Sequence, residues 1–324
     1  MEEKNREKLL EIKDLDVRLF TDRGVLPVVD GLSLSLGAGE TLGVVGESGC
    51  GKSMLASAIM GLIARPGKIT GGSICFRGQD LTALPAKKLR ELRGKEISMI
   101  FQEPMTSLNP LMSCGRQIVE TILAHESVSR AEAKKRALEM IDAVGIPRPG
   151  KVFGEVPAAL SGGMRQRIMI AMALVCNPEL LICDEPTTAL DVTVQAQILK
   201  LIRKLQEDRG TSVIFISHDM GVVSEMADRV AVMYAGQLVE YAKAETIFAH
   251  PLHPYTQGLQ AAIPTVDDDK DMLESIPGSV PMLYELPKGC IFSPRCAHAT
   301  EKCRTERPAM TVHGDGEVRC FLYD

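Results

Sequence analysis

The chain has 324 residues, enough for about two domains, and its 45% hydrophobic and 24% charged residues are ordinary for a globular protein. The net charge of −5 gives no electrostatic reason to expect nucleic acid as the principal partner. The longest apolar run, from Ile168 to Cys176, is about half of the roughly 18 residues that span a bilayer, so any membrane role requires partner proteins.

The first predicted elements are short strands. The N-terminal residues alternate in charge and contain no apolar segment, so we expect no secretory signal and a cytosolic chain. Alternating or continuous apolar patterns predict strands over residues 15–20, 32–36 and 41–45. Helical spacing of apolar residues predicts a helix from Lys52 to Ile63. The order is therefore strand, glycine-rich loop, helix.

The glycine-rich loop matches the phosphate-binding pattern G-x-x-x-x-G-K-[ST] in the structural context that the pattern requires. Its residues are Gly46, Glu47, Ser48, Gly49, Cys50, Gly51, Lys52 and Ser53. Glycines let backbone N–H groups surround phosphates, and a helix N-terminus favours their negative charge. Lys52 is predicted to reach the β- and γ-phosphates of a nucleotide, and Ser53 to bind Mg²⁺.

The middle of the chain changes to a helical pattern. Residues 103–160 read as helices, with Ser129 as the predicted N-cap of a helix over 130–144. An α/β pattern then resumes with a strand over 180–183, a helix over 194–208, a strand over 212–217 and a helix from about residue 220. The helical part therefore reads as an insertion in an α/β domain.

The strand over 180–183 delivers two carboxylates, Asp184 and Glu185, at its C-terminal end, where α/β sheets bind ligands. An apolar strand ending in Asp-Glu would alone be an ordinary solvated strand end. After a phosphate-binding loop, Asp184 is predicted to hold Mg²⁺, and Glu185 to orient and deprotonate the attacking water.

The segment Leu160–Gln166, with Ser161 and two glycines ahead of an apolar helix, resembles the signature sequence of ABC ATPases. A helix cap alone would explain Ser161, Gly162 and Gly163. A helix cap would not explain the full series of motifs. Together with this segment, the order and spacing of the other motif residues match that family: Gln102, Asp184, Glu185, Asp191 and His218.

The resemblance implies an α/β fold: a P-loop ABC ATPase domain over residues 9–250 with an antiparallel β subdomain and a helical subdomain at about 103–165. A small metal-binding C-terminal extension over residues 251–324 follows, since the sequence beyond His250 is rich in proline, charge and cysteine. We expect this extension to be a separate unit.

Further site residues are implied by the resemblance. Gln102 is similar to the Q-loop residue that contacts Mg²⁺ and water, and His218 to the switch histidine at the γ-phosphate. Ser161, Gly162 and Gly163 would bind ATP held by an opposite subunit, and Asp191 would lie at the dimer interface. Phe20 is the best aromatic for stacking on adenine, although it could equally belong to the core.

Three segments resemble one subfamily, the ATPase subunits of oligopeptide and dipeptide importers, and most closely the dipeptide-importer ATPase of the D type. They are the helix that opens at Met164, the segment 101–110 and the segment 253–259. The resemblance implies ATP hydrolysis that drives solute import at the cytoplasmic face of the inner membrane. The implied partners are a second related ATPase, two transmembrane permeases and an extracytoplasmic solute-binding protein, with no nucleic acid. Importers of nickel, glutathione and other small solutes share this architecture.

Four of the nine cysteines crowd the last tenth of the chain, at Cys290, Cys296, Cys303 and Cys320. In a reducing cytosol such crowding favours a metal over disulfides, and four thiolates suit zinc or an iron–sulfur cluster. The spacings are wider than in C-x₂₋₄-C zinc knuckles. The resembling subunits carry a 4Fe-4S cluster here; zinc and plain packing are the alternatives, with His313 as a further candidate ligand.

The cysteines lie over a hundred residues from Lys52 and Glu185, so we expect the metal centre to act structurally and apart from nucleotide binding.

Two other functions compete with import. A soluble ABC ATPase of DNA repair or translation would usually show tandem domains, a coiled-coil insertion or basic surfaces, none of which is evident. A metal-binding interaction module with an incidental nucleotide site would not require the set Lys52, Asp184, Glu185 and His218.

Overall fold

The computed structural model describes residues 8–188, 190–262 and 276–324. The chain divides into two compact units, one from residues 1–83 and 215–324 (unit 1) and one from residues 84–214 (unit 2). The charged N-terminal residues 1–7 and Ala189 in the segment before Asp191 lie outside the described part of the chain. Each unit is described by itself.

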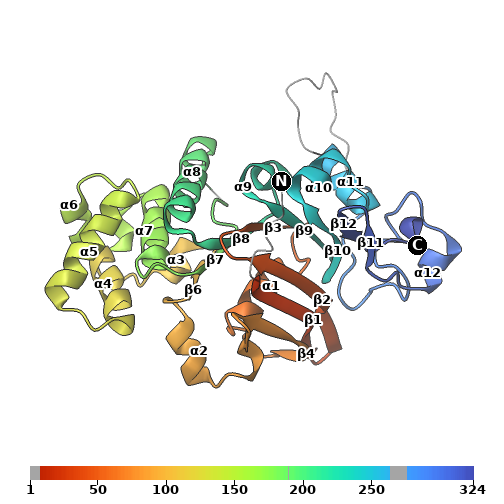
Figure 1. Cartoon of the computed structure of the whole chain (residues 1–324), viewed down its shortest axis with the longest axis horizontal. Helices are drawn as coiled ribbons and strands as arrows, with labels where there is room; N and C mark the ends of the chain where they lie inside the picture. The colour runs from red at the N-terminus through yellow and green to blue at the C-terminus, as the bar shows by residue number, and fades with distance from the viewer. Residues whose placement is uncertain (1–7, 189, 263–275) are drawn as a thin grey trace. The chain divides into compact units, whose positions relative to one another are not determined.

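Unit 1 begins with an antiparallel sheet of strand order β2-β1-β4-β5 (Figure 1). Its strands are β1 (Lys8–Thr21), β2 (Gly24–Gly37), β4 (Gly67–Phe76) and β5 (Gln79–Asp80). The strands predicted at 15–20 and 32–36 lie within β1 and β2, which are much longer. Register shifts in the β1–β2 and β1–β4 pairings absorb turn-type residues that interrupt the alternating pattern.

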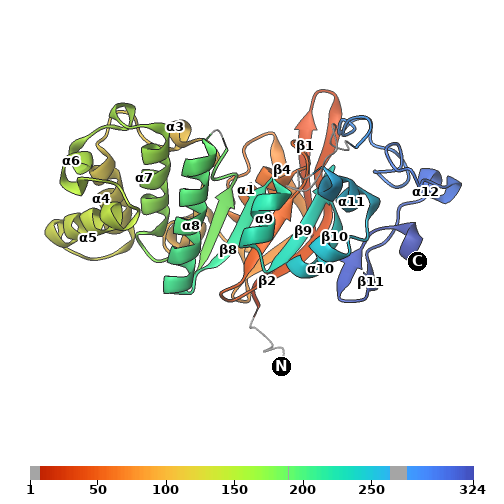
Figure 2. The same ribbon diagram turned by 90° about the horizontal axis from the view of Figure 1, so that it is seen from above.

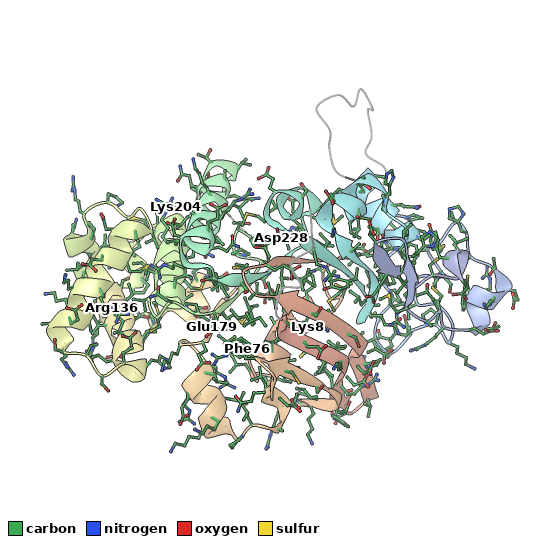
Figure 3. All side chains as sticks on the ribbon, in the orientation of Figure 1. Lys8, Phe76, Arg136, Glu179, Lys204 and Asp228 are labelled. Atoms are coloured by element: carbon green, nitrogen blue, oxygen red, sulfur yellow. The ribbon has the colours of Figure 1, made fainter. Side chains whose placement is uncertain are left out.

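A second set of strands in unit 1 contains β3 (Thr41–Val45), β9 (Arg229–Tyr234) and β10 (Gln237–Lys243). β3 runs parallel to β9, and β9 pairs antiparallel with β10. Asp228, labelled in Figure 3, fixes the β3–β9 register at its start: its carboxylate accepts a hydrogen bond from the Thr41 N–H at 2.8 Å, and its own N–H donates to the Thr41 carbonyl at 2.8 Å. All five residues of β3 are buried, as its apolar sequence predicts.

Helix α1 (Lys52–Ile59) follows β3 and ends four residues before the predicted end at Ile63. The reason is Gly61, whose φ of +60° is the left-handed conformation that terminates helices. Two further helices of unit 1, α9 (Met220–Met226) and α10 (Ala244–Ala249), pack on β3, β9 and β10 (Figure 2).

The C-terminal segment joins this sheet. Two short strands, β11 (Thr311–His313) and β12 (Gly316–Val318), pair with each other, and β12 also pairs with β10 (Figure 1). The remaining elements are α11 (Pro254–Ala261), α12 (Glu301–Thr305) and a 3₁₀ turn, Phe321–Tyr323. The predicted boundary at residues 250 and 251 stays a prediction, but the segment beyond it packs within unit 1 rather than as a compact unit of its own.

Buried polar contacts fasten the start of this segment. Glu240, buried in β10, accepts hydrogen bonds from the N–H groups of Leu252 and His253, both at 2.8 Å. The His253 ring then caps α11, with Nδ1 accepting from the Tyr255 N–H at 3.0 Å. Burial lowers the pKa of His253 to about 3, so the ring stays neutral and Nδ1 remains an acceptor at physiological pH.

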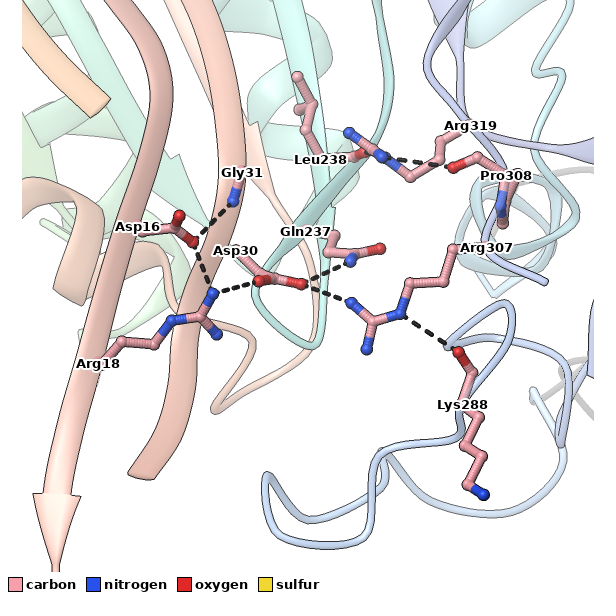
Figure 4. A network of polar contacts seen from close by, with 10 residues as sticks. All are labelled: Asp16, Arg18, Asp30, Gly31, Gln237, Leu238, Lys288, Arg307, Pro308 and Arg319. Atoms are coloured by element: carbon pink, nitrogen blue, oxygen red, sulfur yellow. Dashed lines mark hydrogen bonds and ion pairs between the residues drawn. The ribbon is translucent and has the colours of Figure 1, made fainter. Parts of the chain in front are cut away.

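A second fastening is the network around Asp30 on β2, shown in Figure 4. Its carboxylate accepts from Arg18 at 2.7 Å, from the Gln237 side chain at 2.8 Å and from Arg307 at 2.8 Å. Hydrogen bonding to the side chains of Gln237 and Arg18 lowers the pKa of Asp30 against the opposing effect of burial. One carboxylate thus joins β1, β10 and the C-terminal segment.

Unit 2 carries the predicted helical part. Its helices are α2 (Ala86–Leu92), α3 (Pro104–Ser107), α4 (Cys114–His125), α5 (Arg130–Ala143), α6 (Pro149–Gly154), α7 (Gly162–Leu174) and α8 (Val192–Arg209). Helices α4 to α7 pack together (Figure 1). Ser129 caps α5 as predicted, its hydroxyl accepting from the Glu132 N–H at 3.2 Å. No helix in the described ranges is long and apolar enough to cross a membrane.

Strands β7 (Leu180–Asp184) and β8 (Ser212–Ser217) follow the predictions closely, whereas β6 (Ile97–Ile100) was not predicted. β7 extends the predicted strand by one residue and runs parallel to β6. β8 has the predicted bounds and carries the chain from unit 2 into unit 1. Between them, α8 ends at Gly210, whose φ of +67° gives the left-handed C-cap.

Candidate functional site

The phosphate-binding loop lies between β3 and α1, as predicted. Its backbone is confined by neighbouring main chain: a Cβ on Gly46 would lie 2.2 Å from the Met233 carbonyl oxygen, and one on Gly51 2.5 Å from the Val28 carbonyl oxygen. Both glycines also have positive φ, +151° and +102°. Only glycine meets both demands, so the loop can present its N–H groups at the start of α1.

Lys52 is buried at the centre of this loop, with 4% of its surface exposed. Its ammonium group donates to the Gly46 carbonyl at 2.6 Å and to the Glu47 carbonyl at 3.1 Å. The positive charge is therefore held inside the ring of backbone that would surround phosphates, and its position depends on where these two carbonyls lie.

In unit 2, the end of β7 places Asp184 and Glu185. Asp184 is buried, whereas Glu185 turns into the left-handed region with φ of +47°, a conformation that non-glycine residues adopt rarely and often at functional sites. The Glu185 carboxylate accepts hydrogen bonds from the Gln102 side chain at 3.1 Å and from the Thr188 hydroxyl at 2.9 Å. Two residues singled out independently, Gln102 and Glu185, are thus in contact.

The signature segment forms the N-terminus of α7. The Ser161 hydroxyl accepts from the Met164 N–H at 3.4 Å, so it is an N-cap, while Ser161 and Gly162 remain exposed. A Cβ on Gly163 would lie 3.0 Å from Val194 of α8. Gln166, buried in α7, donates to the carbonyl of Pro186, directly after Glu185. The sequence analysis did not predict this role of Gln166. The one sequence feature that could have indicated it is a polar residue within a mostly apolar helix.

Asp191 and His218 are both exposed. Asp191 caps α8 in unit 2, its carboxylate accepting from the Val194 N–H at 2.9 Å. His218 follows β8 in unit 1, immediately before Asp219, which caps α9 by accepting from the N–H groups of Gly221 and Val222. Both residues thus stand at the junction of a loop and a helix.

Phe20 lies near the end of β1 with 44% of its surface exposed, which excludes the alternative that it belongs to the core. The Lys68 ammonium lies 5.4 Å from the centre of its ring, within the range of a cation–π contact. An exposed ring face in unit 1 is compatible with stacking on a flat ligand.

The four C-terminal cysteines line one cavity of about 130 Å³. Aromatic residues Phe292 and Phe321 share its wall. Burial, together with the neighbouring thiols, raises the pKa values of Cys290, Cys296 and Cys320. His313 does not line the cavity; its ring lies on β11 against Tyr323, with 4.8 Å between ring centres.

In the ranges that the structure describes, no three His, Cys, Asp or Glu side chains are close enough together to hold a single metal ion. The predicted metal centre is therefore not shown by the geometry and stays a prediction. What the residues do provide is four thiols around one apolar cavity, the donor set that both zinc and a 4Fe-4S cluster take.

Comparison with known proteins assigns the chain to a family. The profile described as "ABC transporter" matches residues 29–188, and the profile "Oligopeptide/dipeptide transporter, C-terminal region" matches residues 239–303. Oligopeptide transport ATP-binding protein AppD of Bacillus subtilis is 51% identical over 98% of this chain and 97% of its own length. The chain belongs to the ABC transporter family, in its oligopeptide/dipeptide group.

Other relatives agree with this assignment. The oligopeptide transport ATP-binding protein OppD of Haemophilus influenzae is 51% identical over 97% of both chains, and OppD of Escherichia coli is 50% identical over 97% of this chain and 93% of its own. The chain is thus an ABC ATPase, and the family predicted from its motifs is confirmed.

Solved structures support the fold of this ABC ATPase. A dimeric ATP-binding cassette, MJ0796, bound to ADP and Pi in a post-hydrolysis state matches with a TM-score of 0.66 and 26% identity, over 72% of this chain and 98% of that one. CbiO1 from Clostridium perfringens, part of the transporter complex cbiONQ, matches with a TM-score of 0.64 and 26% identity, over 76% of this chain and 92% of that one. The predicted ABC ATPase fold is confirmed.

The ABC ATPase contains two residues at its P-loop that sequence reasoning missed, Tyr255 and Arg295. Both come from the C-terminal segment and contact Glu47. The segment containing Tyr255 was singled out for its resemblance to the subfamily, but nothing local indicated its target. The expectation that the metal centre acts apart from nucleotide binding concerns the four cysteines and stays a prediction, but Tyr255 and Arg295 of the same segment reach the P-loop.

The confinement of the P-loop predicts unequal effects of two glycine substitutions. Both Gly46→Ala and Gly49→Ala introduce a side chain at positive φ, costing about 1–2 kcal/mol each. Only Gly46→Ala also meets backbone, at 2.2 Å, whereas nothing lies within 4 Å of a Cβ on Gly49. We expect Gly46→Ala to lower the free energy of unfolding by about 1–3 kcal/mol more than Gly49→Ala in urea denaturation. Equal losses would contradict this account of the loop.

Proposed function

We propose that the chain is the ATP-hydrolysing subunit of an importer of oligopeptides or dipeptides. The observation that carries this proposal is the contact between Gln102 and Glu185 in a chain with an intact P-loop. Relatives named for oligopeptide transport, about half identical over nearly the whole chain, support the solute class. Import of nickel, glutathione or another small solute by the same architecture is the alternative.

In this proposal the loop from Gly46 to Ser53 binds the phosphates of ATP, and Phe20 stacks on the adenine ring. Ser53, Gln102 and Asp184 would hold Mg²⁺, whose charge would offset that of the phosphates. Glu185 accepts a proton from the attacking water, with its carboxylate oriented by Gln102 and Thr188. His218 contacts the γ-phosphate.

The exposed signature residues Ser161, Gly162 and Gly163 would act on ATP bound by an opposite subunit, with Asp191 at the interface. Their place at the N-terminus of α7 supports this role, because the N–H groups of a helix's first turn and the helix dipole favour an anion. The proposed partners are a second related ATPase, two transmembrane permeases and an extracytoplasmic solute-binding protein. The chain would then lie on the cytoplasmic face of the inner membrane.

A soluble ABC ATPase of DNA repair or translation is less well supported, since the C-terminal region matches a transporter profile.

We further propose the division into an ATPase domain at 9–250, with its helical subdomain at about 103–165, and an extension at 251–324. A 4Fe-4S cluster held by Cys290, Cys296, Cys303 and Cys320 is the proposed group in the extension, with zinc as the alternative. The observation behind this proposal is that the four thiols line one apolar cavity. Its proposed role is to stabilise the fold of the extension.

The role of Glu185 predicts that Glu185→Gln binds MgATP nearly normally and loses hydrolysis by about 10²-fold or more, because the groups that bind remain while the water is no longer activated. Steady-state turnover of the assembled complex and equilibrium MgATP binding measure the two effects. Glu207→Gln, on the exposed face of α8, is the matched control and should change neither. Turnover of Glu185→Gln within a factor of two of the unchanged complex would exclude the role.

The role of Ser161 and Gly163 in trans predicts that the isolated chain hydrolyses ATP roughly 10²-fold more slowly per site than the assembled complex, because each site lacks its opposing donors. Turnover is measured at saturating MgATP, with the monomeric state of the isolated chain checked by light scattering. Equal turnover by a proven monomer would show that one chain forms a complete site.

The proposed cluster predicts that anaerobically purified protein is brown, absorbs broadly near ~400 nm and contains about four irons per chain. Iron analysis and absorption spectra test it, with Cys75→Ser as a control outside the cavity and Cys303→Ser as the cavity variant. Colourless protein with one zinc per chain would replace the cluster by zinc. Metal-free protein whose extension resists protease equally well would reject both metals.

A further inference from the structure

Glu47, the second residue of the P-loop, is bound by the C-terminal segment through two separate groups. Its backbone N–H donates to the Tyr255 hydroxyl oxygen at 2.8 Å. Its carboxylate accepts two hydrogen bonds from the guanidinium of Arg295, at 2.7 and 3.1 Å. A third group, the Glu47 carbonyl, accepts from the Lys52 ammonium at 3.1 Å. One loop residue therefore links the C-terminal segment to the phosphate-binding lysine.

Arg295 is placed firmly enough to fix its partner. Only 4% of its side chain is exposed, against 32% for that of Glu47. The guanidinium also donates to the carbonyls of Pro277 at 2.9 Å and Ile276 at 3.3 Å, so its plane is set by groups of its own segment. A bidentate, charge-assisted pair with a guanidinium held this way constrains both the position and the orientation of the carboxylate.

Tyr255 is equally fixed. It is fully buried at the start of α11, and its ring packs on Tyr234 of β9 at 4.7 Å and on Phe292 at 5.5 Å between ring centres. Phe292 in turn meets Tyr234 edge to face at 5.2 Å. This aromatic cluster, Tyr234, Tyr255 and Phe292, leaves the tyrosine hydroxyl as a rigid acceptor facing the first N–H after Gly46.

Phosphate binding by a P-loop depends on backbone that is already in the binding shape, because ordering it during binding costs free energy. The Glu47 peptide determines both where the loop leaves β3 and where one of the two carbonyls that hold Lys52 lies. Its own N–H and carboxylate are both taken by residues from outside the loop. Loss of these contacts frees the Glu47 peptide, and with it the Lys52 ammonium.

We propose that the C-terminal segment sets the affinity of the nucleotide site by clamping Glu47, with Arg295 and Tyr255 as positioning residues for the P-loop. The inference rests on the proposed role of the loop in binding nucleotide. It adds that the segment beyond residue 250 is part of the nucleotide site, although no side chain in it is proposed to touch the nucleotide. Removal of the clamp should weaken binding while leaving the chemical step unchanged.

The test compares variants of the full chain in MgADP binding by calorimetry and in ATP hydrolysis by the assembled complex. We expect Arg295→Gln to raise the Kd for MgADP and the KM for ATP about tenfold, and Tyr255→Phe to raise them about threefold to tenfold, with kcat within twofold, since only uniform binding is lost. Arg307→Gln is the matched control: it removes another arginine ion pair of the same segment, to Asp30, and should change these values less than twofold.

The pair itself is tested by a double-mutant cycle. Glu47→Gln keeps the backbone N–H and carbonyl and loses only the ion pair, so it should weaken binding as Arg295→Gln does. The double variant should be no weaker than either single variant if both act through one contact. Additive losses, or unchanged MgADP affinity in a folded Arg295→Gln, would overturn the inference. If Arg295→Gln does not fold, Glu47→Gln and Tyr255→Phe decide it.

Failure of the proposed function is distinguishable from failure of the clamp. If the unchanged chain does not bind MgADP, or Lys52→Ala binds it equally well, the P-loop does not bind nucleotide and the proposed function fails. If the unchanged chain binds MgADP and Lys52→Ala does not, the loop is functional. The behaviour of Arg295→Gln and Glu47→Gln then bears on the clamp alone.

Discussion

The structure of unit 1 depends on how closely main chain surrounds the P-loop. Gly46 lies against β9 and Gly51 against β2, each at a distance that excludes any side chain. The Cys50 carbonyl accepts from the Gly236 N–H at 2.9 Å, and the Gly236 carbonyl accepts from Asp30 of β2, also at 2.9 Å. The loop is thus the place where the antiparallel sheet and the β9–β10 hairpin meet. These neighbours constrain the backbone conformation of the loop, and therefore also the direction of the helix that starts at Lys52.

The elements that were predicted well are those whose conformation depends on short-range sequence patterns. The strands β3, β7 and β8 are short, almost continuously apolar and bounded by glycine or polar residues, so periodicity and length suffice to place them. Ser161 shows where local information stops. Its sequence allowed a helix cap or a residue acting on a partner, and the structure shows the cap, made by an exposed hydroxyl.

The parts that sequence could not predict depend on contacts between distant residues. Arg295 and Glu47 are 248 positions apart, and no periodic pattern links a proline-rich segment to a P-loop. Distance along the chain was therefore a poor guide to distance in the fold. The burial of Phe20 could not be predicted from sequence either, because an aromatic residue in a strand is buried or exposed according to which neighbours cover it. The 44% exposure of Phe20 places it on the surface.

The pairing of β12 with β10 has a consequence for how the C-terminal region can vary. The oligopeptide/dipeptide profile begins at residue 239, inside β10. A chain shortened to residue 250 would uncover the hydrogen-bonding edge of β10, the ring of Tyr234 and the buried carboxylate of Glu240 together. Open edges of this kind invite pairing between molecules. Removal of the region is therefore expected to lower the solubility of the ATPase unless the edge strand is changed as well.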